Sequence, residues 1–210
     1  EMCIRDRTKQ QLTKTQNDFV VRLGHSSMLA KLNGEFVLFD PVFSERASIT
    51  QWLGPKRFHP TPISIDALPA ITAVIISHDH YDHLDKQSVK QLAAKTTQFI
   101  VPLEVGKHLL DWGVPASQIT ELDWWESTTL ANLTFTATPA QHFSGRGLMD
   151  KDKTLWASWV VKGWDSNLFF SGDSGYFSGF KEIGERMGPF DLTMIETGAY
   201  NERWKEIHML

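Results

Sequence analysis

The sequence of 210 residues has one cysteine, Cys3, and this scarcity excludes a disulfide framework or a thiolate metal cage. No apolar run approaches the roughly 20 residues that a membrane-spanning helix needs, so we expect no transmembrane segment. With 21 basic and 25 acidic residues the net charge is −4, and we expect no nucleic-acid partner. A Gly-x-Ser-x-Gly nucleophile elbow is also absent, which argues against a serine nucleophile.

What remains is an ordinary globular composition, with 41% hydrophobic and 22% charged residues, long enough for one domain with a sizeable core. Residues 1–17 are polar and show no period, so we expect a disordered or non-native tail there and a single domain over residues 18–210. The low cysteine content favours a reducing compartment, and we expect a cytoplasmic protein.

Short strands are expected first, over residues 19–23, 28–32 and 35–39. Asn33-Gly34 joins the last two, and both residue types tolerate the positive φ of a two-residue hairpin turn. A proline-containing stretch, residues 44–68, then reads as a long loop of the kind that shapes substrate pockets.

Helices and strands alternate in the middle of the chain, a pattern that is typical of α/β layers. We expect helices over residues 86–95, with Asp85 as the N-cap, and 104–112. The expected strands in and after this stretch are residues 98–101, 119–122, 128–130, 133–138, 154–162, 167–171 and 191–195.

The most informative stretch is residues 71–85. Residues 71–76 form an apolar, β-branched run that suits a strand buried on both faces. Three histidines and two aspartates follow within residues 78–83. Imidazole nitrogens and carboxylate oxygens are common zinc ligands, and a strand end holds them rigidly. The sequence therefore predicts a metal site on the rim of a sheet, to which two further strand-end residues, His142 and Asp173, are candidates.

The pattern His78-x-His80-x-Asp82-His83 resembles the signature of the metallo-β-lactamase fold superfamily. That resemblance implies an α/β fold, a four-layer αββα sandwich with the site at one edge of its two sheets. Further stretches resemble the branch of N-acylphosphatidylethanolamine-hydrolysing phospholipase D and ascorbate-6-phosphate lactonase relatives, namely Gly24-His25-Ser26-Ser27, Phe39-Asp40-Pro41-Val42, Pro139-Ala140-Gln141-His142-Phe143 and residues 196–208.

The resemblance also implies the metal ligands. His78, His80 and His142 would hold one ion, Asp82 and His83 would help to hold a second, and Asp173 would bridge both. We expect two divalent ions, with zinc first and Mn²⁺ or Fe²⁺ as alternatives, because the ligands are imidazole and carboxylate. For the unbound ring nitrogens, Asp79, Asp85 or backbone carbonyls are the expected hydrogen-bond acceptors.

One superfamily ligand has no counterpart: a last histidine, from a later strand, that completes the second metal. His208 resembles instead a histidine that lies near the substrate in the phospholipase-like branch. We therefore expect the domain to be incomplete at its C-terminal end.

The implied function is hydrolysis by a metal-activated hydroxide, most closely a phosphodiesterase of phospholipase D type. Asp82 and His208 are the expected catalytic groups, with His25 and Arg146 as candidates for substrate binding. The expected partner is a small-molecule or phospholipid-like substrate, with peripheral membrane contact open and the oligomeric state undetermined. A sugar-phosphate lactonase of the same fold and a non-catalytic metal-binding fragment are the alternatives.

Overall fold

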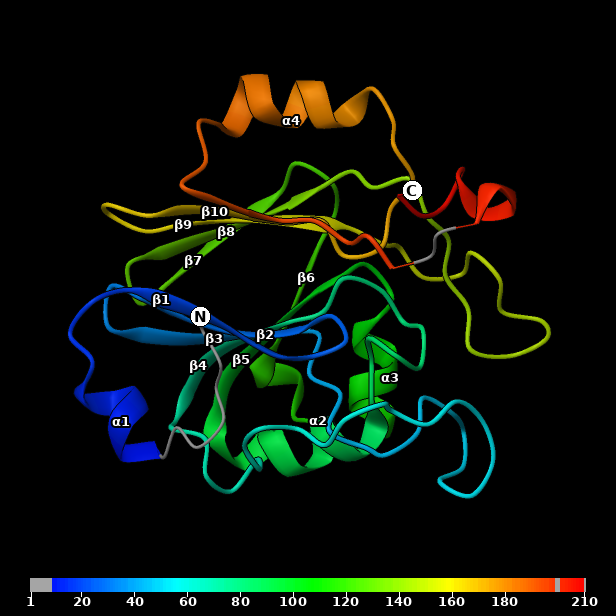
Figure 1. Cartoon of the computed structure of the whole chain (residues 1–210), viewed down its shortest axis with the longest axis horizontal. Coiled ribbons are helices and arrows are strands. Elements are labelled where there is room, and N and C mark those ends of the chain that lie inside the picture. Colours follow the sequence, from blue (N-terminus) through cyan, green and yellow to red (C-terminus); the bar gives the residue numbers. More distant parts are fainter. Residues whose placement is uncertain (1–8, 199–200, 210) are drawn as a thin grey trace.

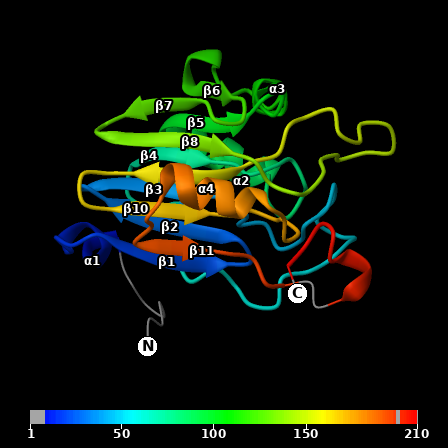
Figure 2. The ribbon, with the colours of Figure 1, turned by 90° about the horizontal axis from the view of Figure 1, so that it is seen from above.

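Two sheets face each other and are covered on their outer sides by helices, so that four layers are stacked (Figure 1). The computed structural model describes residues 9–198 and 201–209. Figure 2, viewed from above, shows helix α4 lying over the strands of the upper sheet. The expected αββα sandwich is thereby confirmed.

The first sheet has six strands in the order β1-β2-β3-β4-β5-β6. Strands β1 to β3 pair antiparallel, and β3 to β6 run parallel. Asn33 and Gly34 have φ angles of 51° and 87°, so the hairpin between β2 and β3 has the expected turn. The bounds are Phe19–Gly24, Ser27–Leu32, Glu35–Phe39, Ile71–Ile75, Thr96–Pro102 and Ile119–Leu122.

The second sheet has five strands in the order β11-β10-β9-β8-β7. All neighbours pair antiparallel except β10 and β11, which run parallel. The bounds of β7 to β11 are Ser127–Leu130, Leu133–Thr138, Ser158–Lys162, Asn167–Phe170 and Leu192–Met194.

Helices α1 to α3 lie on the outer side of the first sheet, and α4 lies on the outer side of the second (Figure 1). Asp85 caps α2 as expected, because its side chain accepts from the backbone N–H of Gln87. Short 3₁₀ helices η1 to η3 span Ala93–Lys95, Ala116–Gln118 and Glu202–Trp204. The α-helices span Lys9–Lys14, Lys86–Leu92, Gly106–Asp111 and Gly179–Met187.

Three apolar clusters fill the three spaces between these layers. Residues of β4 face both sides of the sheet: Ile71 and Val74 join the cluster beneath the first sheet, and Ala73 and Ile75 join the cluster between the sheets. A smaller cluster, which contains Phe169, lies under α4. The expectation that β4 is buried on both faces is confirmed, and this burial makes β4 a rigid base for the residues that follow it.

The structure differs from the expected tail at residues 9–14, which form α1. Leu12 is 1% exposed and belongs to the cluster beneath the first sheet, so burial of apolar surface holds this segment on the domain. Residues 1–8 of the expected tail lie outside the described part of the chain.

Two other expected elements need correction, and one helix has no counterpart among the expected elements. The helix expected over 104–112 begins only at Gly106, because Glu104 has a φ of 65° that an α-helix cannot accommodate. The strand expected over 154–162 begins only at Ser158, since Leu155 and Ala157 donate outside the ladder, to Leu103 and Ser77. Helix α4 was not expected, because Gly179 and Gly184 weaken its helical signal.

Among the helices that the structure describes, none has the length and apolar character required to cross a bilayer.

Candidate metal centre

The candidate ligands follow the carboxyl ends of strands that all finish at one edge of the sandwich. His78 follows β4 in the first sheet, whereas His142 and Asp173 follow β8 and β10 in the second. The two groups meet closely, because a Cβ atom on Gly172 would lie 2.6 Å from the Cβ of Ser77. Glycine, which also tolerates the φ of 57° found there, therefore lets the two loops touch.

The first group of ligands brings together the ring nitrogens of His78, His80 and His142. The Nδ1 atom of His80 lies 2.8 Å from Nε2 of His78 and 3.3 Å from Nε2 of His142. Nitrogens bound to one tetrahedral zinc ion at about 2.0–2.1 Å are separated by about 3.4 Å, so this spacing suits a shared ion after a small adjustment.

Hydrogen bonds behind these rings determine which nitrogen of each ring is free. The Nδ1–H of His142 donates to the carbonyl of Ile207 over 2.8 Å, which leaves Nε2 with its lone pair. Behind His78, the Ser77 hydroxyl donates to the Asp40 carboxylate over 2.6 Å. That hydroxyl can then accept from Nδ1–H of His78, 2.9 Å away, so Nε2 of His78 also points its lone pair into the centre.

His83 shows the same arrangement in a fully buried position. Its Nδ1–H donates to the Asp40 carboxylate over 2.7 Å, and its Nε2 is buried without a hydrogen-bond partner. The nearest carboxylate oxygen, Oδ1 of Asp173, is 3.2 Å away. A buried polar atom without a partner is costly, and a divalent cation bound at this position would accept its lone pair. The donor set therefore fits a metal centre.

The carboxylates of Asp82 and Asp173 lie near His83 and form a second group of candidate ligands with it. Oδ2 of Asp82 lies 3.8 Å from Nε2 of His83 and 2.9 Å from Nε2 of His25. Four overlapping triads offer donor atoms within 4.8 Å of one another: His78–His80–His142, His25–Asp82–His83, His78–His83–Asp173 and His142–Asp173–His208. The predicted residues His78, His80, Asp82, His83, His142 and Asp173 thus converge, and shared members link the triads, as a two-ion centre requires.

The pKa directions follow from burial and from these neighbours. Burial lowers the pKa of His78 well below its ordinary value and that of His142 to about 4, which keeps both rings neutral as ligands. Burial acts the same way on His83, but Asp173 and Asp40 outweigh it and raise its pKa well above the ordinary value. Surroundings that attract a proton to His83 also favour a metal cation there.

The neighbouring histidines keep the carboxylates of Asp173 and Asp82 ionised. Burial alone would raise the pKa of Asp173, but the charge of nearby His83 lowers it to about 2. Burial opposes ionisation of Asp82 as well, and the hydrogen bond from His25 is the largest of the effects that hold its pKa below the usual range.

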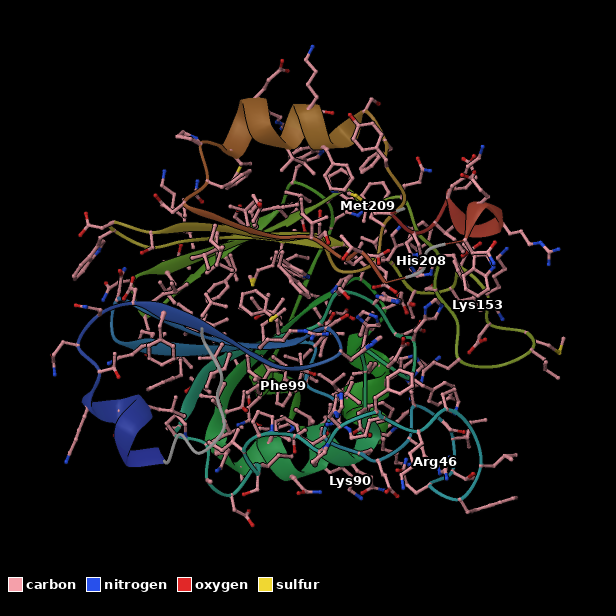
Figure 3. The ribbon with its side chains drawn as sticks, viewed as in Figure 1. Arg46, Lys90, Phe99, Lys153, His208 and Met209 are labelled. Atoms are coloured by element: carbon pink, nitrogen blue, oxygen red, sulfur yellow. The ribbon has the colours of Figure 1, made fainter. Side chains whose placement is uncertain are left out.

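His208 reaches the edge of the centre from the last described segment. Its Nδ1–H donates to Glu196 over 2.8 Å, and the same nitrogen lies 3.7 Å from Asp173. The hydrogen bond to Glu196 raises the pKa of His208. Figure 3 labels His208 at the end of the sandwich where the long loops project. The sequence-predicted His208 is therefore placed beside the ligands, although its Nδ1 is engaged with Glu196.

The structure gives Arg146 contacts that differ from the expected substrate-binding role. Its Nη1 donates to the carbonyls of Asp79 and Leu84 over 2.5 and 2.7 Å, and its guanidinium lies 4.0 Å from the centre of the Tyr81 ring. Arg146 thus ties the loop after His142 to both ends of the histidine-rich loop, as a structural clamp.

The expected hydrogen-bond acceptors also need correction. Asp79 accepts from the backbone of Gly145 and pairs with His108, and Asp85 binds Ser44, Ser88 and the start of α2. The acceptors that orient the candidate ligands are Asp40, Ser77 and the carbonyl of Ile207. Only the last belongs to an expected class, that of backbone carbonyls.

The family model described as "Beta-lactamase superfamily domain" matches residues 35–210, which include every candidate ligand. The chain belongs to the beta-lactamase superfamily. Within it, the chain is 50% identical over 187 residues to "Uncharacterized protein Rv0906" of Mycobacterium tuberculosis, covering 89% of this chain and 50% of that protein.

A second relative carries a functional name. The chain is 41% identical over 196 residues to "N-acyl-phosphatidylethanolamine-hydrolyzing phospholipase D 1" of Caenorhabditis elegans, covering 89% of this chain and 55% of that protein. The chain therefore spans about half the length of these curated relatives.

Solved structures agree on the superfamily fold. The isothiocyanate hydrolase from Delia radicum gut bacteria superposes with a TM-score of 0.69 at 20% identity, covering 90% of this chain and 76% of that one. CmlA, described as a diiron β-hydroxylase from Streptomyces venezuelae, superposes with a TM-score of 0.64 at 20% identity, covering 87% and 35%.

Proposed function

We propose that this chain carries the metal centre of a hydrolase that cleaves a phosphodiester bond in a phospholipid-like substrate. The observation that carries the hydrolase assignment is the convergence of inward-facing imidazole nitrogens from His78, His83 and His142 beside two ionised carboxylates. The substrate class is supported by the 41% identity to the phospholipase D of Caenorhabditis elegans.

His78, His80 and His142 would hold one divalent ion, and Asp82 and His83 a second, with Asp173 between them. When bound, the two ions would lower the pKa of a water molecule and would provide positive charge that stabilises a developing oxyanion. Zinc is the expected occupant, since the donors are imidazole and carboxylate, and Mn²⁺ and Fe²⁺ suit the same donors.

The protein's own groups have separate tasks in this proposal. Asp82 is held in one orientation by the 2.9 Å contact with His25 and accepts a hydrogen bond from the attacking water, which it thereby orients. His208, whose pKa the hydrogen bond to Glu196 raises, holds a proton on Nε2 for the departing oxygen while Glu196 fixes Nδ1. His25 is thus a positioning residue in this proposal.

The test compares Asp82→Asn with the unchanged protein on a panel of phosphodiesters and sugar-phosphate lactones. We expect metal-dependent phosphodiester hydrolysis that falls on the order of 10²-fold in the variant, as for a positioned catalytic group. Asp165→Asn, in the exposed β9–β10 turn, is the matched control. Near-normal activity of the Asp82 variant would contradict the assigned role, and lactone hydrolysis alone would identify a lactonase.

A further inference from the structure

Two long loops leave the protein body on either side of the metal centre. The first, residues 41–62, begins directly after Asp40, the acceptor of His83. The second, residues 143–157, begins directly after His142, and its Phe143 ring lies 4.6 Å from the ring of His80. Figures 1 and 2 show both loops projecting at the same end of the sandwich. Their tips therefore flank the approach to the candidate ligands.

These loops expose large apolar side chains that a protein usually buries. The first loop presents four of them and the second presents two, with exposed fractions from 63% to 103%: Ile49 76%, Trp52 77%, Leu53 63%, Phe58 98%, Leu148 103% and Met149 86%. Isolated exposed apolar residues are common, but six on two loops at the same end of the sandwich form a pattern that marks an interaction surface. We name these six residues the apolar rim.

The charge of the same loops differs in sign from that of the whole chain. Residues 41–62 and 143–157 contain six basic and three acidic residues, although the chain as a whole has a net charge of −4. Figure 3 labels Arg46 in the first loop and Lys153 in the second, both at the end that carries His208. Phe58 also lines a hollow of about 500 Å³, together with Lys56, Arg57, His59 and Glu45, which pairs with Lys56 over 2.7 Å. The two loops that carry the apolar rim thus have a net positive charge.

Hydrogen bonds fix both loops at their bases, so the exposed residues are held in a defined position relative to the protein body. Arg57 donates to the carbonyls of Val42 and Ser44, which closes the first loop, and Ser44 is fixed to Asp85. In the second loop, Arg146 and the contact between Asp79 and Gly145 provide the anchor. A rigid base with an apolar, cationic tip is the arrangement that suits the boundary between lipid head groups and acyl chains.

We propose that the apolar rim and its basic residues dock the protein on an anionic lipid surface, with the metal centre facing that surface. This proposal deepens the proposed function and rests on it, since docking would bring a phospholipid head group to the ligands. The apolar side chains enter the interface, and the loop cations contact lipid phosphates.

Co-sedimentation of the metal-loaded protein with phosphatidylcholine vesicles, with or without phosphatidylglycerol, tests the proposal. We expect binding that requires phosphatidylglycerol and weakens in high salt. Trp52→Ser with Phe58→Ser should reduce vesicle affinity by about tenfold or more, because each buried aromatic side chain contributes strongly to partitioning. Lys151→Glu with Lys153→Glu should have a comparable effect.

Matched controls lie away from the loops. Trp164, 74% exposed in the turn between β9 and β10, provides the control Trp164→Ser. Lys90, exposed on α2 and labelled at the lower face in Figure 3, provides Lys90→Glu. Vesicle binding that is absent, or that falls equally in rim and control variants, would overturn the proposal.

A soluble short-chain phosphodiester separates this proposal from the proposed function. Rim variants should keep its hydrolysis while losing vesicle binding. Metal-dependent hydrolysis without any vesicle binding would overturn docking alone, and vesicle binding without phosphodiester hydrolysis would overturn the proposed function alone. Sedimentation velocity without lipid tests whether the apolar rim instead binds a second copy of this chain. A dimer that the rim substitutions dissociate would also overturn the lipid proposal.

Discussion

The histidines that follow β4 and the histidine that follows β8 are held by different kinds of neighbour. Behind His78 and His83 lies Asp40, which is fully buried at the end of the adjacent parallel strand β3. Behind His142 lies the carbonyl of Ile207, in a late segment whose regular structure is one short 3₁₀ helix. One half of the centre is therefore built into a sheet, and the other depends on a segment packed against it.

This difference predicts how each half responds to change. The hydrogen bonds that hold His78 and His83 lie within the buried core, so their loss should lower both the free energy of unfolding and the metal affinity. Displacing Ile207, which holds His142, should lower metal affinity with a smaller loss in the free energy of unfolding, because residues 201–209 belong to neither sheet. Variants at Asp40, Gly175 and Arg146 examine this comparison.

Asp40→Ala should have the largest effect. It leaves the backbone N–H of Ser77 and Nδ1 of His83 without their acceptor in a fully buried site. We expect a loss of about 3–5 kcal/mol in the free energy of unfolding, measured by denaturant titration after chelation. Metal affinity, measured by calorimetry, should fall by about 10- to 100-fold.

The matched control is Asp165→Ala, in an exposed turn, for which we expect no change in metal affinity. Equal metal affinity in the two variants would contradict the role of Asp40 as the acceptor that orients His83.

Gly175→Ala should have an intermediate effect that is confined to the other half. An added Cβ would lie 2.4 Å from the carbonyl oxygen of Glu206, so the segment that carries Ile207 and His208 must shift. We expect about a tenfold loss of metal affinity by calorimetry, since a hydrogen-bond partner of a ligand is displaced. The free energy of unfolding should fall by only about 1–2 kcal/mol, as for local overpacking.

Gly184→Ala provides the control, because nothing lies within 4 Å of a Cβ at that position in α4. It should leave metal affinity unchanged and stabilise the helix by about 0.5–1 kcal/mol. A Gly175 variant that destabilises the fold as much as the Asp40 variant would remove the distinction between the two halves.

Arg146→Lys should have the smallest effect of the three. Lysine keeps the charge but lacks the planar fork that grips the Asp79 and Leu84 carbonyls and stacks on Tyr81. We expect a loss of about 1–2 kcal/mol in the free energy of unfolding and less than about tenfold in metal affinity. Arg203→Lys, at an exposed position in η3, should change neither quantity and serves as the control.

The sequence was sufficient for features that depend on local pattern. The apolar run of β4 followed by the histidine-rich loop, the Asn33-Gly34 turn and the alternating strand β8 all have signals within a few residues. His142 and Asp173 were found because each follows a strand end in a chain that already carries the main motif. These are the ligands, which chemistry restricts to few residue types.

The supporting residues were missed because their roles depend on contacts between distant parts of the chain. Asp40 reaches His83 only because β3 pairs in parallel with β4, which the residues of either strand do not specify. Glu196 reaches His208 only when the late segment folds back. A strand-end aspartate in residues 39–42 was the available signal for the first, and for the second only the resemblance of residues 196–208 to the phospholipase-like branch was available.

Metal content of the protein purified without added metal, measured by elemental analysis, tests the central claim most directly. We predict about one to two transition-metal ions per chain, and a fall to near zero in His78→Ala with His80→Ala, whose fold is checked by circular dichroism. A content far below one ion per chain that the double substitution leaves unchanged would contradict the assignment of this cluster as a metal centre.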